Sequence, residues 1–523
     1  MSFQLSRRKF LATGATAGAA SAMGGFFMPS ISRAADRPMI THGVQSGDVT
    51  ANTACIWGRA DRASRMITEI ATTEGFKNSV RIPHVDVLPE RDFAGKLALA
   101  DLPAGHDVFY KIHFESLDDA RASSEPIIGH FRTAPAAKRN IRFGWSGDTA
   151  GQGWGIDEDR GGMKTYATIA KHNPDFFIHS GDTIYADGPF AETQKTPDGQ
   201  IWKNITTEDT AKVAETIDEF RGNYKYNMLD QHLREFNRLI PVYYQWDDHE
   251  VTNNWYPGEM LLGDDRYTEK SVSLLAARAN RAFREMLPVT EHASEPGRVY
   301  RKVSYGPSLE IFFLDMRTYR GTNDANNSAT PTDNTDFLGR AQMEWLKRGL
   351  LNSKATWKVI AADMPIGMIV YDDWKNKSTF ENLANGDGAP AGRELEIVEL
   401  LRFIKNAKIN NTVWLTADVH YTAAHYYDPN KAQFQDFEPF WEFVSGPLHA
   451  GTFGPSDMDN TFGPQVKFTK HPTKEQGVNL PPSYGLQFFG LVDIDAETEQ
   501  FRVSLRDVAD EELYTVTLDP VFG

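Results

Sequence analysis

Acidic side chains recur directly after short apolar runs in this sequence, and a tyrosine and a histidine stand close behind two of them. The set comprises Asp148, Asp182, Tyr185, Asp248, Asp418 and His420. Cleavage of a phosphate ester by metal ions needs hard Lewis acids on the phosphoryl oxygens and an activated water in line with the leaving group. Two neighbouring metal ions also need a shared carboxylate between them. The sequence therefore predicts a phosphoesterase site with two or three metal ions.

A candidate proton donor and a candidate phosphate-binding cation accompany this set. His249 directly follows Asp248, and its imidazole could protonate the departing alkoxide. Arg317 follows another apolar run, and a guanidinium can bind phosphate through two parallel hydrogen bonds. Arg317 could instead pair with Asp315 or with another structural carboxylate. The sequence leaves both interpretations open.

Several other residues also have two interpretations. Asp363 follows the apolar run at 357–362 and is either a further metal ligand or a turn cap. Asn253, His425 and His449 are candidates for lining the pocket, although a core or surface position is favoured for His425. Gly-Asp pairs are common turn formers, so the ordered set supports the metal site better than any single residue does.

The apolar runs are typical of buried strands whose carboxyl ends deliver the site residues. Strands are predicted at 141–143, 175–180, 241–246, 309–314, 357–362 and 412–416. Helices are predicted near 163–171, 210–236 (in two stretches), 339–351 and 394–406. Ligands of open α/β sheets lie at the carboxyl ends of the strands, where the loops converge. Packing alone does not explain carboxylates at the ends of so many strands.

Residues 36–135 have a different pattern, with short β-rich segments separated by turns. Strands are predicted there at 54–57, 66–70, 81–85, 96–100, 108–114 and 127–131. This spacing favours a β-sandwich domain, with a linker at 133–138 and a catalytic domain over 136–523. Further strands are predicted at 488–494, 502–506 and 512–518, where a meander would complete the edge of the catalytic sheet.

Length and composition restrict the class of protein. The chain has 523 residues, of which 41% are apolar and 24% charged, and this indicates a globular protein of two or three domains. The net charge of -16 argues against stable binding to nucleic acid or anionic membranes. Cys55 is the only cysteine, so an intrachain disulfide is excluded.

The N-terminal 35 residues have the layout of an export signal. Arg7 and Arg8 precede an apolar stretch over 11–28, and a small-residue cleavage site follows near Ala34 and Ala35. This arrangement resembles a twin-arginine signal, which would make the twin-arginine translocation machinery a transient partner. The expected location is periplasmic or secreted. No later segment is long and apolar enough for a membrane span.

The motifs in their order resemble the calcineurin-like metallophosphoesterases, and more closely their alkaline phosphatase D (PhoD-like) branch. The motifs that carry the resemblance are Gly-Asp-Thr-Ile-Tyr at 181–185, Trp-Asp-Asp-His-Glu-Val at 246–251, Leu-Asp-Met-Arg at 314–317 and Phe-Val-Ser-Gly-Pro at 443–447. The resemblance implies an α/β (α+β) metallophosphoesterase β-sandwich flanked by helices. A small all-β immunoglobulin- or fibronectin-like domain would precede it.

The resemblance also implies a ligand set. Asp182 would bridge two metals, and Tyr185 would bind Fe(III) together with Asp148 and His420. At the second metal the family's usual Asn and His are replaced by Asp248 and Asp418, with Asp363 as a possible addition. A site made only of carboxylates favours Ca²⁺ over Zn²⁺, although Mn²⁺ or Mg²⁺ would accept the same oxygens.

The expected function is a secreted phosphomonoesterase or phosphodiesterase with an alkaline optimum, in which a metal-activated hydroxide attacks phosphorus directly. Its substrates would be small-molecule, lipid or nucleotide phosphate esters, and aromatic residues near the predicted loops could shape the pocket. These aromatic residues are Trp154, Trp255, Tyr256 and Trp374. One alternative is a phospholipase D-like or nucleotide phosphodiesterase on the same fold. Another is a non-catalytic envelope protein that binds carbohydrate or phosphate, which would have no use for His249 as a proton donor.

Overall fold

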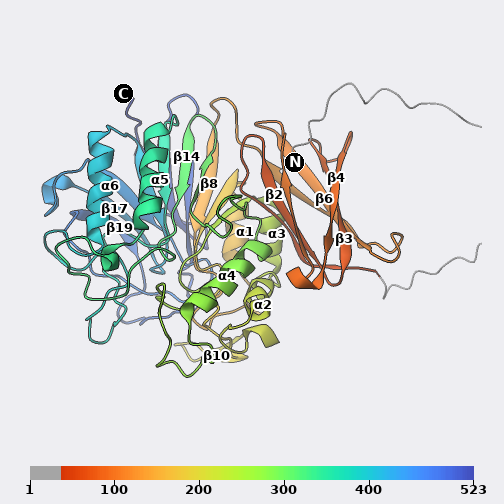
Figure 1. The fold of residues 1–523 in the computed structure, drawn as a ribbon, viewed down its shortest axis with the longest axis horizontal. Coiled ribbons are helices and arrows are strands. Elements are labelled where there is room, and N and C mark those ends of the chain that lie inside the picture. The colour runs from red at the N-terminus through yellow and green to blue at the C-terminus, as the bar shows by residue number, and fades with distance from the viewer. Residues whose placement is uncertain (1–36, 523) are drawn as a thin grey trace, which may run out of the picture.

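The structure is a computed structural model that describes residues 37–522. The predicted export signal, residues 1–35, lies outside the described residues. Two regions follow each other along the chain, a small β domain and a larger α/β region (Figure 1). The predicted linker at 133–138 falls between the last strand of the first region and the first strand of the second.

The N-terminal region is a seven-stranded antiparallel sandwich. One layer contains β1 (Ile40–Gly47), β2 (Ala54–Ala60) and β5 (Ala94–Leu99). The other layer has the order β4 (Val80–Val87), β3 (Ser64–Ala71), β6 (Asp107–Ser116) and β7 (Ile127–Arg132). Buried and half-buried residues alternate along β6, as expected for a strand with one face on a core. This arrangement of three strands on four confirms the predicted immunoglobulin- or fibronectin-like domain.

The larger region consists of two mixed sheets packed face to face. The first sheet has nine strands in the order β22-β21-β20-β8-β9-β12-β1-β2-β5 and so includes three strands of the N-terminal domain. Its remaining strands are β8 (Ile141–Ser146), β9 (Phe176–Ser180), β12 (Val242–Gln245), β20 (Phe488–Ile494), β21 (Phe501–Asp507) and β22 (Glu512–Leu518). The last three strands form the predicted antiparallel meander beside β8.

The second sheet has seven strands in the order β13-β14-β15-β16-β18-β17-β19. The strands are β13 (Arg301–Ser304), β14 (Leu309–Phe313), β15 (Trp357–Ala361), β16 (Thr412–Thr416), β17 (Thr422–Tyr427), β18 (Phe440–Val444) and β19 (Pro464–Lys470). The inner faces of the two sheets share one buried core, to which Phe143, Ile178, Ile311 and Leu415 contribute. Because β8, β9 and β12 run parallel, as do β14, β15, β16 and β18, their carboxyl ends gather at one edge.

Helices cover the outer faces of both sheets. The first sheet is covered by α1 (Lys164–Ala170), α2 (Ile217–Asn227), α3 (Gln231–Leu239) and α4 (Val272–Met286). The second sheet is covered by α5 (Gly339–Asn352) and α6 (Glu394–Asn406), which lie side by side at the far end from the N-terminal domain (Figure 1). The predicted β-sandwich flanked by helices is therefore confirmed.

Short elements complete the described chain. They are the hairpin of β10 (Thr193–Lys195) and β11 (Ile201–Lys203), and the 3₁₀ turns η2 (Pro89–Arg91), η3 (Glu208–Thr210), η4 (Asp333–Thr335), η5 (Pro429–Lys431) and η6 (Pro482–Tyr484). Among residues 37–522, no helix is both long and apolar enough to cross a bilayer.

Helix α4 was not predicted, although its sequence carries a recognisable signal. The hydroxyl of Ser271 accepts a hydrogen bond from the backbone N–H of Leu274, which caps the helix. Its buried residues follow the spacing of one helical face, and they are Val272, Leu275, Ala279, Ala282, Phe283 and Met286. The cap and this spacing together are the sequence signal from which α4 could have been predicted.

The start of α6 contains a buried carboxyl group that makes stability depend on pH. Glu394 is almost fully buried, and burial together with the nearby Asp459 raises its pKa to about 9. The folded state therefore holds a proton that the unfolded chain loses above its pKa of 4.5, so stability falls as pH rises from there to about 9.

We expect Glu394→Gln to remove this pH dependence. Each pH unit in that window costs about 1.4 kcal/mol, so the variant should gain roughly 2–3 kcal/mol on wild type between pH 6 and pH 8. Urea unfolding at the two pH values measures this difference. Glu399→Gln on the same helix is the control, because pairing with Lys347 and Arg340 overcomes burial and lowers the pKa of Glu399. A Glu394→Gln variant with the wild-type pH dependence would contradict the prediction.

Candidate metal centre

The loops after β8, β9 and β16 bring one compact group of ligands together. Carboxylate oxygens of Asp148 and Asp182 and a ring nitrogen of His420 all lie within 4.8 Å of one another. The Tyr185 hydroxyl lies 2.8 Å from Nε2 of His420, so its oxygen reaches the same place. Nδ1 of His420 donates to the Gly451 carbonyl, which leaves Nε2 as the nitrogen that faces the group. The four residues predicted for the first metal are therefore assembled.

Two further groups overlap with the first. Asp182, Asp248 and His249 form one of them, and Asp247, Asp248 and Asp418 form the other, each with ligand atoms within 4.8 Å. Asp182 belongs to two groups and Asp248 to two, as shared ligands of neighbouring ions would. Asp247 was not among the predicted ligands, because an Asp beside another Asp carries no signal of its own.

The ligand-bearing loops have a strained backbone. Asp148, Asp182, Asp418 and His420 all have φ between 51° and 66°, a left-handed conformation that non-glycine residues seldom adopt. A buried carboxylate, Glu250, holds two of these loops in place. It accepts hydrogen bonds from the backbone N–H groups of Thr183 (2.6 Å), Asp247 (2.7 Å) and Asp182 (3.2 Å). Sequence reasoning included Glu250 in a motif but gave it no role.

Electrostatics in this centre favour a bound cation. Burial raises the pKa of Asp148 and of Asp182 well above the ordinary value, and the neighbouring charges of Asp247 and Asp248 add to the rise. Oδ2 of Asp148 is buried and has no hydrogen-bond partner among the described residues. In the first group the donors are carboxylate oxygens, one phenol oxygen and one imidazole nitrogen, a set suited to hard cations. The residues present therefore fit metal ions.

His249 is held beside these groups by a second carboxylate. Its Nδ1 lies 2.7 Å from Oδ1 of Asp187, and its ring centroid lies 4.3 Å from that of Tyr185. Burial lowers the pKa of His249, but the charges of Asp187 and Asp248 raise it to about 10. Asp187 also accepts a hydrogen bond from the backbone of Asn253. Asp187 was not predicted, although it stands two residues beyond Tyr185.

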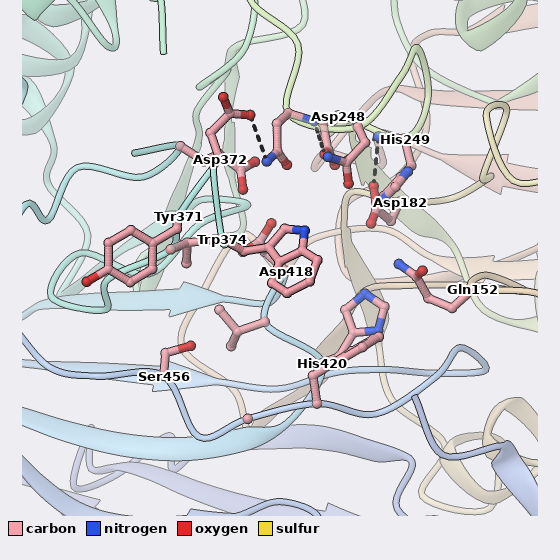
Figure 2. A pocket seen from close by; sticks show the side chains of 17 residues that line it. Gln152, Asp182, Asp248, His249, Tyr371, Asp372, Trp374, Asp418, His420 and Ser456 are labelled. Carbon is pink, nitrogen blue, oxygen red and sulfur yellow. Dashed lines mark hydrogen bonds between the residues drawn. The ribbon is translucent and has the colours of Figure 1, made fainter. Parts of the chain in front are cut away.

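A cleft of about 280 Å³ opens onto these residues, and we call it the acidic cleft (Figure 2). Its lining includes Asp182, Asp248, His249, Asp418 and His420, so predicted site residues from three loops face one space. The opposite wall comes from the segments around 370–381 and 453–456. The full lining is Gln152, Asp182, Asp248, His249, Asn253, Asn254, Val370, Tyr371, Asp372, Trp374, Glu381, Asp418, Val419, His420, Phe453, Gly454 and Ser456.

Comparison with known proteins assigns the chain to a family. Residues 143–505 match the PhoD-like phosphatases, and residues 26–135 match the N-terminal domain of the PhoD-like phosphatases. The chain belongs to the PhoD-like phosphatase family. The family resemblance inferred from the ordered motifs is thereby confirmed.

Individual relatives agree with this assignment. Alkaline phosphatase D of Bacillus subtilis (strain 168) is 27% identical over 404 residues, which are 73% of this chain and 64% of that protein. A solved structure of PhoD aligns with a TM-score of 0.67 and 20% identity, over 92% of this chain and 89% of that one. A purple acid phosphatase from yellow lupin (Lupinus luteus) seeds aligns with a TM-score of 0.58 and 12% identity, over 92% and 74%. The two structures support the fold alone.

Arg317 of this PhoD-like chain does not lie where a phosphate clamp must lie. Its side chain has no exposed surface, and it is not part of the lining of the acidic cleft. Its guanidinium lies 2.6 Å from a carboxylate oxygen of Asp247 and 2.5 Å from one of Glu381. Carboxylates of Asp248 and Asp418 lie 3.8 and 3.7 Å away. The structure therefore pairs Arg317 with carboxylates, as one of its two interpretations expects, and places it outside the lining where a clamp would lie.

Asp363, a predicted additional ligand, also lies beneath the cleft. Its carboxylate is fully buried 3.7 Å from Nε of Arg317 and belongs to none of the three ligand groups. Burial and the charge of Asp247 raise its pKa well above the ordinary value. The structure therefore gives Asp363 the position of a counter-ion for Arg317 instead of that of a metal ligand.

The weaker candidates divide between the cleft and the core. Asn253 and Trp374 line the cleft, whereas Trp154 and Trp255 are buried outside it. The lining also excludes Tyr256. Both remaining histidines are core residues. His425 Nδ1 lies 3.0 Å from Glu442, and His449 Nε2 lies 3.0 Å from the Gly155 carbonyl.

Gly446, in the motif at the end of β18, leaves room for a ligand. A Cβ atom at this position would lie 2.1 Å from Oδ2 of Asp148. We expect Gly446→Ala to displace that carboxylate and to lower both metal content and kcat/KM by about 10–100-fold, the usual effect of disturbing a residue that supports a ligand. Elemental analysis and kinetics measure the two effects. Gly388→Ala is the control, because a Cβ there meets nothing within 4 Å. Wild-type metal content in Gly446→Ala would refute the prediction.

Proposed function

We propose that this protein is an exported, metal-dependent phosphoesterase that hydrolyses phosphate mono- or diesters by direct attack of water on phosphorus. The observation that carries the proposal is the overlap of three ligand groups at Asp182 and Asp248, with His249 held beside them by Asp187. Membership of the PhoD-like phosphatases and the likeness to alkaline phosphatase D support it. A protein that only binds phosphate would need the ligands but not the Asp187–His249 pair.

Each residue has a role in this proposal. Asp148, Asp182, Tyr185 and His420 would hold one ion, and Asp248 and Asp418 would hold a second with Asp182 shared between them. Bound metal ions supply Lewis acidity to the phosphoryl oxygens and make the attacking water more acidic. Among residues 37–522, no lysine or arginine lines the cleft, so these ions would provide the positive charge that a phosphate needs.

His249 would complete the reaction at the leaving group. As the oxygen of water bonds to phosphorus, the bond from phosphorus to the ester oxygen breaks and leaves an alkoxide. The imidazolium of His249 would give its proton to that oxygen, and the charge of Asp187 favours the protonated ring beforehand. Asp187 also fixes the ring orientation through its contact with Nδ1.

For the metals we propose Fe(III) at Tyr185 and Ca²⁺ at the carboxylate site, with Mn²⁺, Mg²⁺ and Zn²⁺ as alternatives. A phenol oxygen together with carboxylates favours a hard trivalent ion, and a site of carboxylates alone favours Ca²⁺. Elemental analysis of the full chain is the direct test. Iron with calcium would support the assignment, and zinc or manganese would overturn it without overturning the phosphoesterase.

A charge-transfer band would link Tyr185 to the iron. We expect the purified protein to absorb visible light through the Tyr185 phenolate on Fe(III), and we expect Tyr185→Phe to lose this band because the phenol oxygen is gone. Tyr421→Phe is the control, since the Tyr421 hydroxyl contacts Met368 and the backbone of Ser456. A band that persists in Tyr185→Phe would exclude this residue as the ligand.

Turnover tests the function itself. Initial rates with a chromogenic phosphate monoester and a chromogenic diester, before and after removal of metals by a chelator, separate an esterase from a binding protein. Hydrolysis that the chelator abolishes and that added metal restores is the expected result. No hydrolysis of either ester under any metal loading would contradict the proposal. It would favour the alternative of a non-catalytic envelope binding protein.

We also propose the domain limits and the location. Residues 36–135 would form the β domain and residues 136–523 the catalytic domain, and the twin-arginine pathway would export the protein to the periplasm or beyond. The paired Arg7 and Arg8 before an apolar stretch support export. Fractionation of cells that express the full chain tests it, and a protein that stays entirely in the cytoplasm would refute it.

A further inference from the structure

Trp374 stands at the mouth of the acidic cleft with most of its side chain in solvent. It is 78% exposed, yet it lines the same space as Asp248, Asp418 and His420. Figure 2 shows its indole between Tyr371 on one side and Gln152 on the other. Large aromatic side chains are usually mostly buried, so an indole left open beside a reaction site is available to a ligand.

The segment that carries Trp374 forms a turn with hydrogen bonds of its own. Tyr371 and Phe380 pair across its base, and their ring centroids lie 5.1 Å apart. Asp373 accepts hydrogen bonds from the hydroxyl of Ser378 (2.6 Å) and from the backbone of Asn376 (3.0 Å). The indole is therefore presented from a fixed turn.

This turn is also hydrogen-bonded to the loop that contains Asp248 and Asn254. The side chain of Asn254 donates to Asp372 at 3.1 Å, and the backbone of Asn254 donates to Asp248 at 2.6 Å. Trp374 thus stands two residues from Asp372, and Asn254 links Asp372 to the predicted metal ligand Asp248.

The rest of the cleft restricts what the indole can contact. No lysine or arginine among residues 37–522 lines the cleft, and Asp372 adds a carboxylate on the turn that carries Trp374, so a leaving group with further phosphates is disfavoured. The side-chain amides of Gln152 and Asn253 have no hydrogen-bond partner within residues 37–522 and can bind neutral donors and acceptors. The indole shares the lining with two further rings, those of Tyr371 and Phe453.

We propose that Trp374 is a specificity-determining residue whose indole stacks on the nucleobase of a nucleoside leaving group. A nucleobase is flat, uncharged and edged with hydrogen-bonding groups, as this wall of the cleft requires. Stacking on an aromatic side chain tolerates any base, since every base has a π-face. The inference rests on the proposed phosphoesterase function and adds a substrate class to it.

The test compares two esters that differ in the group beyond the oxygen. Adenosine 5′-monophosphate and glycerol 3-phosphate both release a primary alcohol, so the ratio of their kcat/KM values reports contacts with the base. We expect Trp374→Ala to lower this ratio roughly 5- to 150-fold, the range given by base stacking, and Trp374→Phe to restore most of it. Lys375→Ala, one residue along the same turn, is the matched control and should keep the wild-type ratio.

Three results would overturn the inference. Equal losses for both esters in Trp374→Ala would mean that the indole only supports the cleft. A loss for choline phosphate as large as that for the nucleotide would make the indole a site for quaternary ammonium. If wild type hydrolyses no ester, the proposed phosphoesterase function fails separately. Calorimetric titration with adenosine then tests whether the Trp374 indole binds a nucleobase. Equal adenosine binding by wild type and Trp374→Ala would refute stacking on Trp374.

Discussion

Replacing His249 by asparagine is expected to lower kcat for an alkyl phosphate by about 10²–10⁴-fold, the usual contribution of a positioned proton donor. The loss should be smaller for a p-nitrophenyl ester, because p-nitrophenolate leaves without needing a proton. Comparing the two esters therefore separates proton donation from a general disturbance of the site. Equal losses for both esters would contradict the role of His249 as the donor.

Metal content must be measured on the same variant, because His249 also forms a ligand group with Asp182 and Asp248. The proposed donor role requires that His249→Asn keeps the wild-type number of metal ions. A variant that loses an ion would make His249 a ligand. The activity loss would then report an incomplete metal centre.

Asp187→Asn is the matched variant for the orientation of the ring. The asparagine keeps the size of the side chain but removes the charge that lies 2.7 Å from Nδ1 of His249. That charge raises the pKa of His249, so its removal lets the ring lose its proton at lower pH. The alkaline limb of the kcat profile should move to lower pH, whereas a merely structural role would lower kcat at every pH alike.

The sequence located the aspartates that the structure brings together because the signal for them is local. Asp148, Asp182 and Asp418 each follow a buried parallel strand within two residues, and parallel strands in one sandwich must end at one edge. Spacing along the chain was therefore enough to bring them together. Tyr185 and His420 stand within three residues of such an aspartate, and the family resemblance implied their roles.

The residues that support the ligands could not be found in this way. Glu250 accepts hydrogen bonds from the backbone of Thr183 and Asp182, which precede it by 67 and 68 residues in sequence. Only the folded arrangement reveals these partners. Glu381 reaches the cleft from a long irregular segment between β15 and α6, where neither strand nor helix periodicity offers guidance. For these residues the position depends on tertiary packing and not on local pattern.

Arg317 shows why a local pattern can leave two roles open for one residue. It follows β14 much as the ligands follow their strands, and an arginine at that edge suits phosphate chemistry. The turn after β14 instead directs its side chain under the cleft, where Asp247, Glu381 and Asp363 surround it. Burial, which the sequence does not reveal, changes a substrate-binding cation into an internal counter-ion.

This position makes Arg317 one of the most sensitive residues of the fold. We expect Arg317→Met to destabilise the metal-free protein by about 3–5 kcal/mol, because removing one partner of a buried ion pair leaves the other charges uncompensated. The closest of those charges are Asp247 and Glu381, at 2.6 and 2.5 Å. Added metal should recover part of the loss, since bound cations would offset the same carboxylates. Urea unfolding with a chelator and with metal measures both effects.

A double variant connects this loss to the buried charges themselves. Asp363 lies 3.7 Å from Arg317 outside the ligand groups, so Asp363→Asn removes one of the uncompensated carboxylates without removing a predicted cleft ligand. Arg317→Met with Asp363→Asn should therefore be more stable than Arg317→Met alone, which gives a favourable coupling in a double-mutant cycle. A phosphate clamp at Arg317 makes the opposite prediction, namely a raised KM with unchanged stability. A stable Arg317→Met protein whose only defect is weak substrate binding would instead identify Arg317 as a phosphate-binding residue.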